Sequence, residues 1–382
     1  MSNKLPNGWK ECKLGEVIEL LYGKGLREQD RKPGNIPVYG SNGIVGYHNE
    51  YLVKGPGIII GRKGSVGEVK YSPVDFFPID TTYYVSLKEG MADIRFMYYF
   101  LLTLHIDEMN SHSAVPGLNR NDVYSLDVTL PPLPEQRAIA SVLSNLDDKI
   151  DLLHRENKTL EAMAEALFRQ WFIEEAKDEW EEVSLGDSSL ATIIKSGINR
   201  FEGEKIYLET SDVDNTNVKE GVPITFGNRP SRANMEPVVY SVWFAKKGGV
   251  RKLLMFDDYS QGLNKLVLST GFTGLKTTEL SHYYIWCYIM SSEFQEIKDS
   301  FVSGSVQPDI NNDGVKQIMI PNPDNETLLK FNSIVKELFS KISFNQQQIH
   351  TLEKLRDTLL PKLMSGEVRV KYEEEGVASC RA

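Results

Sequence analysis

The sequence predicts an α+β protein in which two similar α/β domains are separated by two long helices that form an intramolecular antiparallel coiled coil. Three observations support this prediction. Several motifs occur twice in the same order, each half opens with a strand-rich segment, and each half closes with a helix whose apolar residues recur about every 3.5 positions. We expect a chain duplicated in this way to be pseudo-twofold symmetric.

The duplication is visible from the beginning of each half to its end. Trp-x4-Leu-Gly begins at Trp9 and again at Trp180, an offset of 171 residues. The later pairs are AVPGLNRNDV (114–123) with SVQPDINNDGV (305–315), SVLSNLDDKI (141–150) with SIVKELFSKI (333–342), and TLEAMAEALF (159–168) with TLEKLRDTLL (351–360). The two helical pairs share an offset of 192, so the second globular part is about 21 residues longer than the first. This period is far too long for a solenoid and indicates a duplicated domain plus helix.

Each half begins with strand-rich chemistry. Runs such as GIIIG (57–61) and TTYYVSL (81–87) are separated by turn residues, which is typical of short strands. The first long helix begins at LPPLPEQR, where Pro134 suits the first helical position and Glu135 favours the positive end of the helix dipole.

Both long helices carry a heptad pattern. Their apolar seams step alternately by four and three residues, through Ile139, Leu143, Leu146, Ile150, Leu153, Asn157, Leu160, Ala164, Leu167 and Trp171 in the first, and Phe331, Val335, Leu338, Ile342, Asn345, Ile349, Leu352, Arg356, Leu359 and Leu363 in the second. This pattern favours coiled-coil packing. The alternative is an amphipathic helix lying on a globular core, which usually has a wider apolar stripe.

One asparagine interrupts each seam and predicts how the helices pair. A polar side chain in an apolar seam is costly unless it meets another polar group. In a parallel pairing that follows the repeat, Asn157 would face Ile349 and Asn345 would face Leu153. An antiparallel pairing lets Asn157 meet Asn345, places Ala164 opposite Leu338 and Trp171 opposite Phe331, and leaves only Leu146 opposite Arg356 as an awkward layer.

Composition limits the class of protein. The 382 residues are 41% hydrophobic and 25% charged, close to the average of globular proteins. No run approaches the roughly 18 apolar residues of a membrane span, and the N-terminus lacks the apolar core of a signal peptide. The three cysteines are too few and too scattered for a disulfide framework or a zinc cluster. We therefore expect a cytoplasmic protein with no membrane partner.

The net charge of -10 excludes a uniformly basic surface but allows local basic patches. Residues 22–73 contain eight basic and four acidic side chains, and residues 229–252 contain six basic and one acidic. Interleaved Gly, Ser, Asn and Tyr suit contacts to phosphates and base edges. A single such segment would indicate a solvated surface, but its occurrence in both halves favours DNA binding. The candidate residues are Lys24, Arg27, Ser41, Asn42, Arg62, Lys63 and Arg120 in the first half and Arg229, Arg232, Lys246, Lys247, Arg251 and Lys252 in the second.

Sequence signatures of catalysis are missing. The chain has no Gly-Lys-Ser/Thr triplet, no His-Glu-x-x-His, no Cys-x-x-Cys and no nucleophile elbow. GRKGSVG (61–67) resembles a phosphate loop, but strand-like runs on both sides favour a hairpin turn. We expect no cofactor, no metal and no catalytic residue, although a catalytic pair assembled from distant residues stays an open alternative.

The whole chain resembles the specificity subunits of type I restriction-modification systems. The resemblance rests on Trp-x4-Leu-Gly at Trp9, PVYGSNGIVGY, GRKGSVG, the Pro-Leu-Pro-Glu-Gln that precedes the first long helix, and the duplication. The second half departs from this pattern, with IPNPDNE before its helix and AKKGGVR (245–251) only loosely matching GRKGSVG.

The resemblance implies a non-catalytic subunit that recognises double-stranded DNA. Each target-recognition domain would read half of a bipartite target, while the helices would separate the domains and dock two methyltransferase subunits, with motor-nuclease subunits completing the enzyme. The expected divisions are recognition domains at 1–132 and 176–321, spacer helices at 133–175 and 322–366, and a tail at 367–382. The alternative is a non-catalytic coiled-coil assembly protein that binds other proteins.

Overall fold

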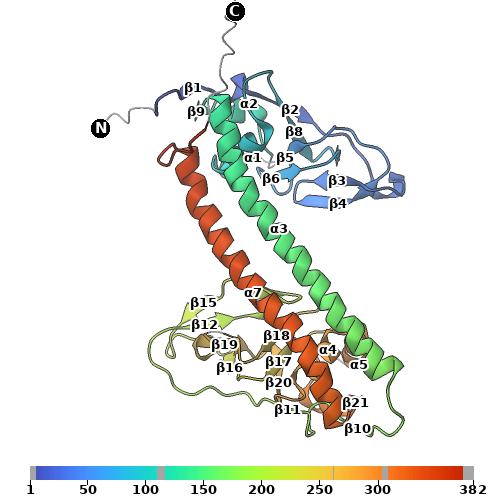
Figure 1. Cartoon of the computed structure of the whole chain (residues 1–382). Helices are drawn as coiled ribbons and strands as arrows, with labels where there is room; N and C mark the ends of the chain where they lie inside the picture. Colours follow the sequence, from blue (N-terminus) through green and yellow to red (C-terminus); the bar gives the residue numbers. More distant parts are fainter. Residues whose placement is uncertain (1–5, 110–116, 261, 303–308, 373–382) are drawn as a thin grey trace, which may run out of the picture. The chain divides into compact units, whose positions relative to one another are not determined.

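A computed structural model describes residues 6–109, 117–260, 262–302 and 309–372 (Figure 1). The chain divides into two compact units, unit 1 comprising residues 1–151 and 350–382, and unit 2 comprising residues 152–349. Each unit contains one mixed domain and a part of both long helices. Residues 114–116 and 305–308 of the duplicated motifs, and 373–382 of the expected tail, lie outside the described residues.

Unit 1 is built mainly on antiparallel strands. Its strands are β1 (Lys10–Lys13), β2 (Ile18–Tyr22), β3 (Ile36–Gly40), β4 (Gly43–His48), β5 (Gly57–Gly61), β6 (Val69–Ser72), β7 (Phe77–Pro78), β8 (Thr82–Leu87) and β9 (Asp127–Leu130), and its helices are α1 (Ile94–Leu102), α2 (Arg120–Tyr124) and the first half of α3 (Leu133–Arg169). They form sheets of order β2-β8-β5-β6, β4-β3-β7 and β1-β9. Strand β5, the GIIIG run, is buried along its whole length.

Unit 2 repeats this plan. Its strands are β10 (Glu182–Ser184), β11 (Ala191–Ile193), β12 (Lys205–Leu208), β13 (Val213–Asp214), β14 (Asn217–Val218), β15 (Val222–Ile224), β16 (Ala233–Met235), β17 (Ser241–Ala245), β18 (Leu253–Phe256), β19 (Leu266–Ser269), β20 (Phe272–Thr277) and β21 (Met319–Pro321), and its helices are α4 (His282–Met290), α5 (Ser292–Val302), α6 (Asn312–Gln317) and most of α7 (Asn325–Met364). The sheets have the orders β11-β20-β17-β18, β15-β12-β19-β16, β10-β21 and β13-β14.

The two topologies correspond in their main sheets, and unit 2 adds β13, β14 and β16. In both domains the strand that opens the fold pairs with the one that precedes the long helix, as β1 with β9 and β10 with β21. The second sheet of each contains one parallel pair, β3 with β7 and β12 with β19. Most of the extra length of the second domain lies between β12 and β17, which begin 36 residues apart, against 21 for β3 and β5. The predicted α+β fold with two similar domains and two long helices is confirmed.

The duplicated tryptophans join the beginning of each domain to the beginning of its long helix. The Trp9 indole donates to the Glu135 carboxylate at 3.2 Å, and Arg369 also binds this buried carboxylate. In unit 2 the Trp180 indole donates to Asp324 at 3.3 Å, and Lys177 pairs with Asp324 at 2.8 Å. The bond from Lys177, together with the Thr327 amide, lowers the pKa of Asp324 below its ordinary value.

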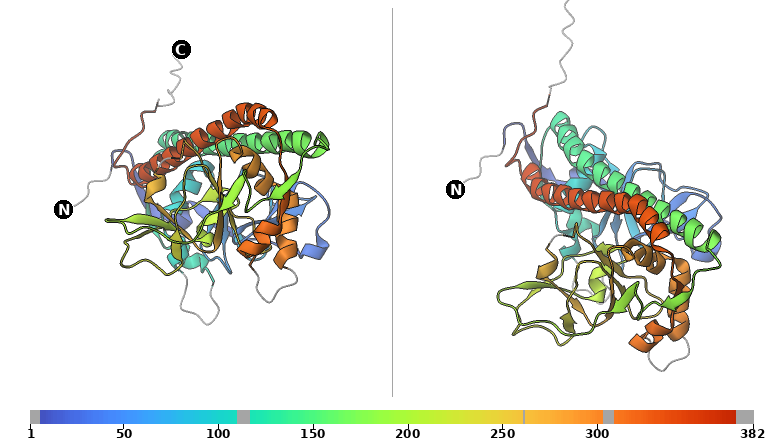
Figure 2. Two further views of the ribbon diagram at one scale, coloured as in Figure 1. Left: turned by 90° about the horizontal axis from the view of Figure 1, so that it is seen from below. Right: turned by 60° about the horizontal axis from the view of Figure 1, so that its bottom comes forward.

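The long helices α3 and α7 are each continuous (Figure 2). A π-helical turn at Gln170–Glu174 extends α3. Within unit 2 the Asn345 amide donates to the Asn157 carbonyl oxygen at 2.8 Å, and the rings of Trp171 and Phe331 lie 5.9 Å apart. From the first contact to the second, the residue number increases along the first helical segment and decreases along α7, so the helices are antiparallel there. The two asparagines meet as the antiparallel register predicts.

Two details of the predicted seam differ from the structure. Leu338 is only half-buried, whereas Phe339 is buried and stacks on Tyr283 of α4 at 5.7 Å. Here α7 packs on the domain as well as on α3, so its apolar stripe is wider than a two-helix seam requires. In unit 1 Arg356 bonds to Asp147 at 3.0 Å, which satisfies the one awkward layer.

We expect Asn157→Leu to lower the free energy of unfolding by about 1–3 kcal/mol, because it leaves the buried Asn345 amide short of a partner. Changing both Asn157 and Asn345 to Leu should cost less than the single change, since no unpaired amide then remains. Urea denaturation of the four members of this double-mutant cycle tests the coupling. The exposed His154→Leu is the control and should change stability by less than about 0.5 kcal/mol. Additive effects of the two asparagine changes would contradict the interpretation.

Candidate nucleic-acid interface

In unit 1 the basic segment 62–64 lies where three loops meet. It follows β5 in the β5–β6 hairpin, as the sequence predicts for GRKGSVG. The Arg62 amide donates to the carbonyl of Thr81, before β8, at 2.9 Å, and its carbonyl accepts from the Leu118 amide, before α2, at 3.0 Å. The Ser41 hydroxyl lies 2.5 Å from the Lys63 carbonyl oxygen and 2.7 Å from that of Thr81. The backbone therefore holds this turn from several sides.

Unit 2 holds a lysine at the same place by the same bonds. The Lys246 amide, directly after β17, donates to the Gly271 carbonyl at 2.9 Å, and the Lys246 carbonyl accepts from the Ile310 amide at 3.0 Å. Lys246 thus occupies the place of Arg62, so the loose match between AKKGGVR and GRKGSVG is a structural equivalence. Each domain presents a cationic residue at its junction of three loops.

Burial lowers the pKa of Lys246. The nearby Asp309 acts against this shift, and the charge of Arg232 adds to it. The Arg232 guanidinium lies beside Gly271, whose carbonyl accepts from the Lys246 amide, so these two cations are neighbours in unit 2.

Arg62 and Arg120 come together in unit 1 around a side chain that the sequence analysis did not single out. Their guanidinium carbons lie 5.2 and 5.4 Å from the ring centroid of Tyr22, whose side chain is 52% exposed at the end of β2. Arg62 also donates two hydrogen bonds to the Asp80 carbonyl oxygen. Tyr22 could have been suspected from its place at the beginning of the first basic segment.

The other candidates separate into exposed side chains and side chains that the fold uses. Lys24, Asn42, Lys63, Arg232 and Lys247 are exposed. Arg27 is exposed but paired with Asp30 at 2.7 Å. Those with partners inside the fold are Ser41, Arg229 (to the Ala233 carbonyl), Arg251 (to the Met290 carbonyl) and Lys252 (to the Thr210 and Val213 carbonyls). Ser41 and Lys252 thus hold neighbouring loops through these bonds, and a DNA contact by either stays a prediction.

Some glycines beside these residues are required by the local backbone, whereas others leave open space next to it. A Cβ on Gly61 would lie 2.0 Å from the Ser65 carbonyl oxygen, so the turn itself requires glycine there. Gly43 and Gly64 have positive φ values of 119° and 79° and nothing near a Cβ position. Both leave the backbone open to a close approach.

Among the described residues no group of His, Cys, Asp and Glu side chains could hold a metal ion. No helix in the described part of the chain is long and apolar enough to cross a membrane.

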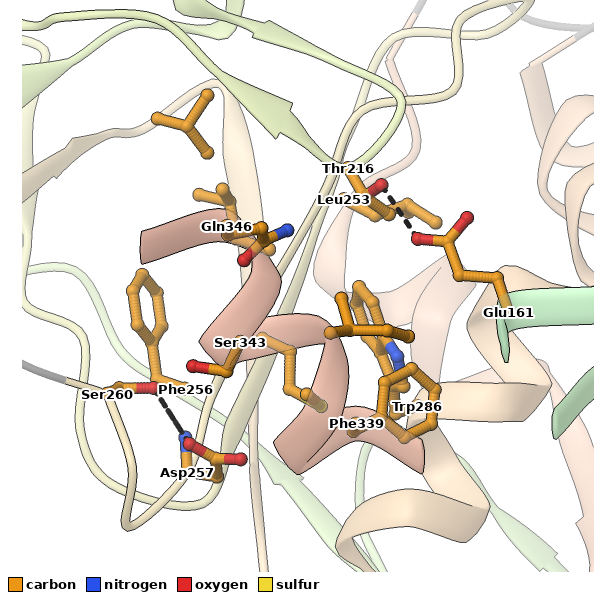
Figure 3. A pocket seen from close by; sticks show the side chains of 14 residues that line it. Glu161, Thr216, Leu253, Phe256, Asp257, Ser260, Trp286, Phe339, Ser343 and Gln346 are labelled. Atoms are coloured by element: carbon orange, nitrogen blue, oxygen red, sulfur yellow. Dashed lines mark hydrogen bonds between the residues drawn. The ribbon is translucent and has the colours of Figure 1, made fainter. Parts of the chain in front are cut away.

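A cavity of about 150 Å³ in unit 2 lies between β18, α4, α7 and Glu161 of α3 (Figure 3). The Thr216 hydroxyl donates to the Glu161 carboxylate at 3.1 Å, and the Trp286 indole nitrogen is buried without a hydrogen-bond partner. Burial raises the pKa of Glu161, as does Glu165, while Thr216 and Arg251 act in the opposite direction.

Comparison with known proteins identifies the family. Residues 6–162 match the family described as "Type I restriction modification DNA specificity domain". The "Type I restriction enzyme MjaIX specificity subunit" of Methanocaldococcus jannaschii is 27% identical, over 96% of this chain and 95% of its own length. The EcoDI specificity subunit of Escherichia coli is 20% identical, over 98% and 92%.

The solved S subunit of the type I restriction-modification system from M. genitalium has the same fold. It covers 98% of this chain and 99% of its own, with a TM-score of 0.62 and 17% sequence identity. Fold and sequence therefore indicate the same class of protein, the specificity subunits. Residues 6–162 thus match a type I DNA specificity domain, and nearly the whole chain is similar to specificity subunits of type I restriction-modification systems.

We expect the stability of the protein to fall as the pH rises through the folded-state pKa of Glu161. The raised pKa means that the folded state binds the proton more tightly than the unfolded state, so its stabilising effect is present at low pH and is lost on ionisation. Glu161→Gln should flatten this dependence and stabilise the protein at neutral pH. Urea denaturation between about pH 4 and pH 7.5 measures it, with the exposed Glu296→Gln as control. An unchanged pH profile in Glu161→Gln would contradict the assignment.

Proposed function

We propose that this chain is the DNA-recognition subunit of a type I restriction-modification enzyme, acting in the cytoplasm. Each domain reads one half of a bipartite target in double-stranded DNA, and the helices set the distance between the halves. The observation that carries this proposal is the duplicated junction of three loops. A cation, Arg62 or Lys246, lies there in each domain, held by equivalent backbone bonds. Catalysis would belong to partner subunits, with no cofactor bound to this chain.

The division of labour follows the domain boundaries given above. Residues 1–132 and 176–321 are proposed as the recognition domains, 133–175 and 322–366 as the spacer, and 367–382 as a tail. Helix α3 has 37 residues, about 55 Å at 1.5 Å per residue, roughly one and a half turns of duplex DNA. Such a length suits two half-sites separated by base pairs that the protein does not read.

The partners in this proposal are two methyltransferase subunits, joined by motor-nuclease subunits in the complete enzyme. Exposed apolar side chains on the long helices support such docking. Leu152 and Met163 of α3 are 49% and 48% exposed, and Phe344 and Leu355 of α7 are 54% and 45% exposed. Both pairs are eleven residues apart, about three helical turns, so each pair shares one face of its helix. The repeat offset of 192 places Leu152 on Phe344 and Met163 on Leu355, so the apolar pair is itself duplicated.

The rival interpretation is an assembly protein whose helices pair between chains. Against it, the Asn157–Asn345 bond uses the polar positions of the seam within one chain. The exposed apolar side chains lie outside the predicted seam, where a second protein has access to them.

Exchanging residues 1–132 for the matching domain of a relative should change one half of the DNA target and leave the other half intact. Each domain carries its own cationic junction, so each should read independently. The DNA target is measured with the complex of this chain and its methyltransferase, by selecting methylated sites from a random duplex pool before and after the exchange. A change in both halves would mean that the domains form one composite reading surface. A wild-type complex without sequence preference would contradict the proposed function.

Leu152→Glu and Phe344→Glu should each weaken binding of the methyltransferase about tenfold or more, because each removes a large apolar contact and adds a charge that must be desolvated. Isothermal titration of the intact chain with the methyltransferase measures the affinity and the stoichiometry. His350→Glu is the matched control, exposed on α7 about 120° around the helix from Phe344. Equal affinities for all three variants would place the docking surface elsewhere.

A further inference from the structure

The cluster of Tyr22, Arg62 and Arg120 in unit 1 brings two like charges onto one exposed ring. Both guanidiniums lie within 5.4 Å of the Tyr22 ring centroid, within the range of cation–π attraction. Neither forms an ion pair with any residue in the described part of the chain. The ring offsets only part of the repulsion between two cations, so the arrangement favours an anion between or beside them.

The donors of the cluster are fixed in direction and incompletely used. A guanidinium has five N–H groups, and Arg62 gives two of them to the Asp80 carbonyl oxygen at 3.2 and 2.7 Å. These bonds, and the backbone bonds of Arg62 to the neighbouring loops, hold it in place and leave three donors for a ligand. The Arg120 side chain makes no hydrogen bond to a described residue and contacts the Tyr22 ring. Planar donors of this kind match the oxygens of a phosphodiester.

The ring of Tyr22 packs on a second, buried tyrosine. Its ring lies 5.0 Å from that of Tyr83, which is buried and donates to the Leu118 carbonyl oxygen at 3.2 Å. Leu118 is also the residue whose amide binds the Arg62 carbonyl. The ring that gathers the two arginines is therefore fastened to the same loops that carry them.

Unit 2 lacks this cluster although it repeats the junction. Lys246 occupies the place of Arg62, and Asn312 occupies that of Arg120, directly after the capping residues Asn311 and Asn119. A lysine presents a point charge where an arginine presents a planar fork, and no second cation follows the cap. The cluster thus distinguishes the first domain from the second.

We infer that Tyr22, Arg62 and Arg120 form a binding site for one backbone phosphate of the DNA, with Tyr22 as the positioning residue that holds both guanidiniums. This inference rests on the proposed function. The site fixes the first domain on the duplex independently of sequence, and it leaves base reading to other side chains. A carboxylate of a protein partner offers similar oxygens, so the test must separate the two sources.

The test uses the full chain with its methyltransferase and a duplex containing its selected target. Arg120→Gln and Tyr22→Leu should weaken binding roughly tenfold at about 0.1 M salt and lower the slope of log K against log salt by about one, as expected for one lost phosphate contact. Tyr22→Phe keeps the ring face and should behave like wild type. Lys330→Gln removes an exposed charge of α7 and should leave the slope unchanged.

A scan with single neutral methylphosphonates identifies the ligand. One position should weaken the wild-type complex about tenfold and have no further effect on Arg120→Gln, because the contact is already gone. A changed sequence preference in Arg120→Gln, an unchanged salt slope, or the absence of such a position would overturn the inference. Weakened methyltransferase binding with normal DNA affinity would assign the cluster to a protein carboxylate and also overturn it. If the wild-type complex shows no sequence preference, the proposed function itself fails.

Discussion

The hydrogen bond between Asn157 and Asn345 is the constraint on which the arrangement of the long helices depends. Apolar seams with a 3.5-residue repeat can slide by whole heptads at little cost, but two buried amides find each other in only one register. That register is accompanied in unit 2 by the contact of Trp171 with Phe331, and in unit 1 by the pair of Arg356 with Asp147. The two buried asparagines thus select one register of the helix pair from several that would bury similar apolar surface.

The duplicated scaffold has also diverged where each domain packs on its helices. In unit 1 the otherwise apolar contact contains a polar centre, because Tyr99 and Arg356 both bind Asp147 of α3. In unit 2 the residue equivalent to Asp147 is Phe339, which stacks on Tyr283. The Trp–carboxylate bonds at the beginning of the helices are instead retained in both units. The anchors common to both halves therefore lie at the helix starts, and the contacts further along can vary.

The proposed DNA interface follows the same logic of a constant frame with variable side chains. Backbone hydrogen bonds hold residue 62 and residue 246 at equivalent places, which does not depend on the identity of the side chain. An arginine with a tyrosine and a second arginine, or a lysine beside another arginine, can then be presented on the same frame. Because the backbone holds the loops, the proposed DNA-contacting side chains can differ between domains without loss of the fold.

The duplication, the fold class and the antiparallel helix pairing could be predicted from sequence, because repeats, strand runs and heptads are local patterns and the two asparagines constrain the register. The site could be predicted only in part. Which candidate side chains are free to meet DNA depends on partners distant in sequence. Lys252 donates to the carbonyls of Thr210 and Val213, and Ser41 donates to that of Thr81. Tyr22 contacts two arginines that lie 40 and 98 residues away in sequence. A charge count cannot distinguish a lysine that binds carbonyls inside the fold from one that faces solvent. Only tertiary structure decides this, since it determines which carbonyls lie within reach of each cation.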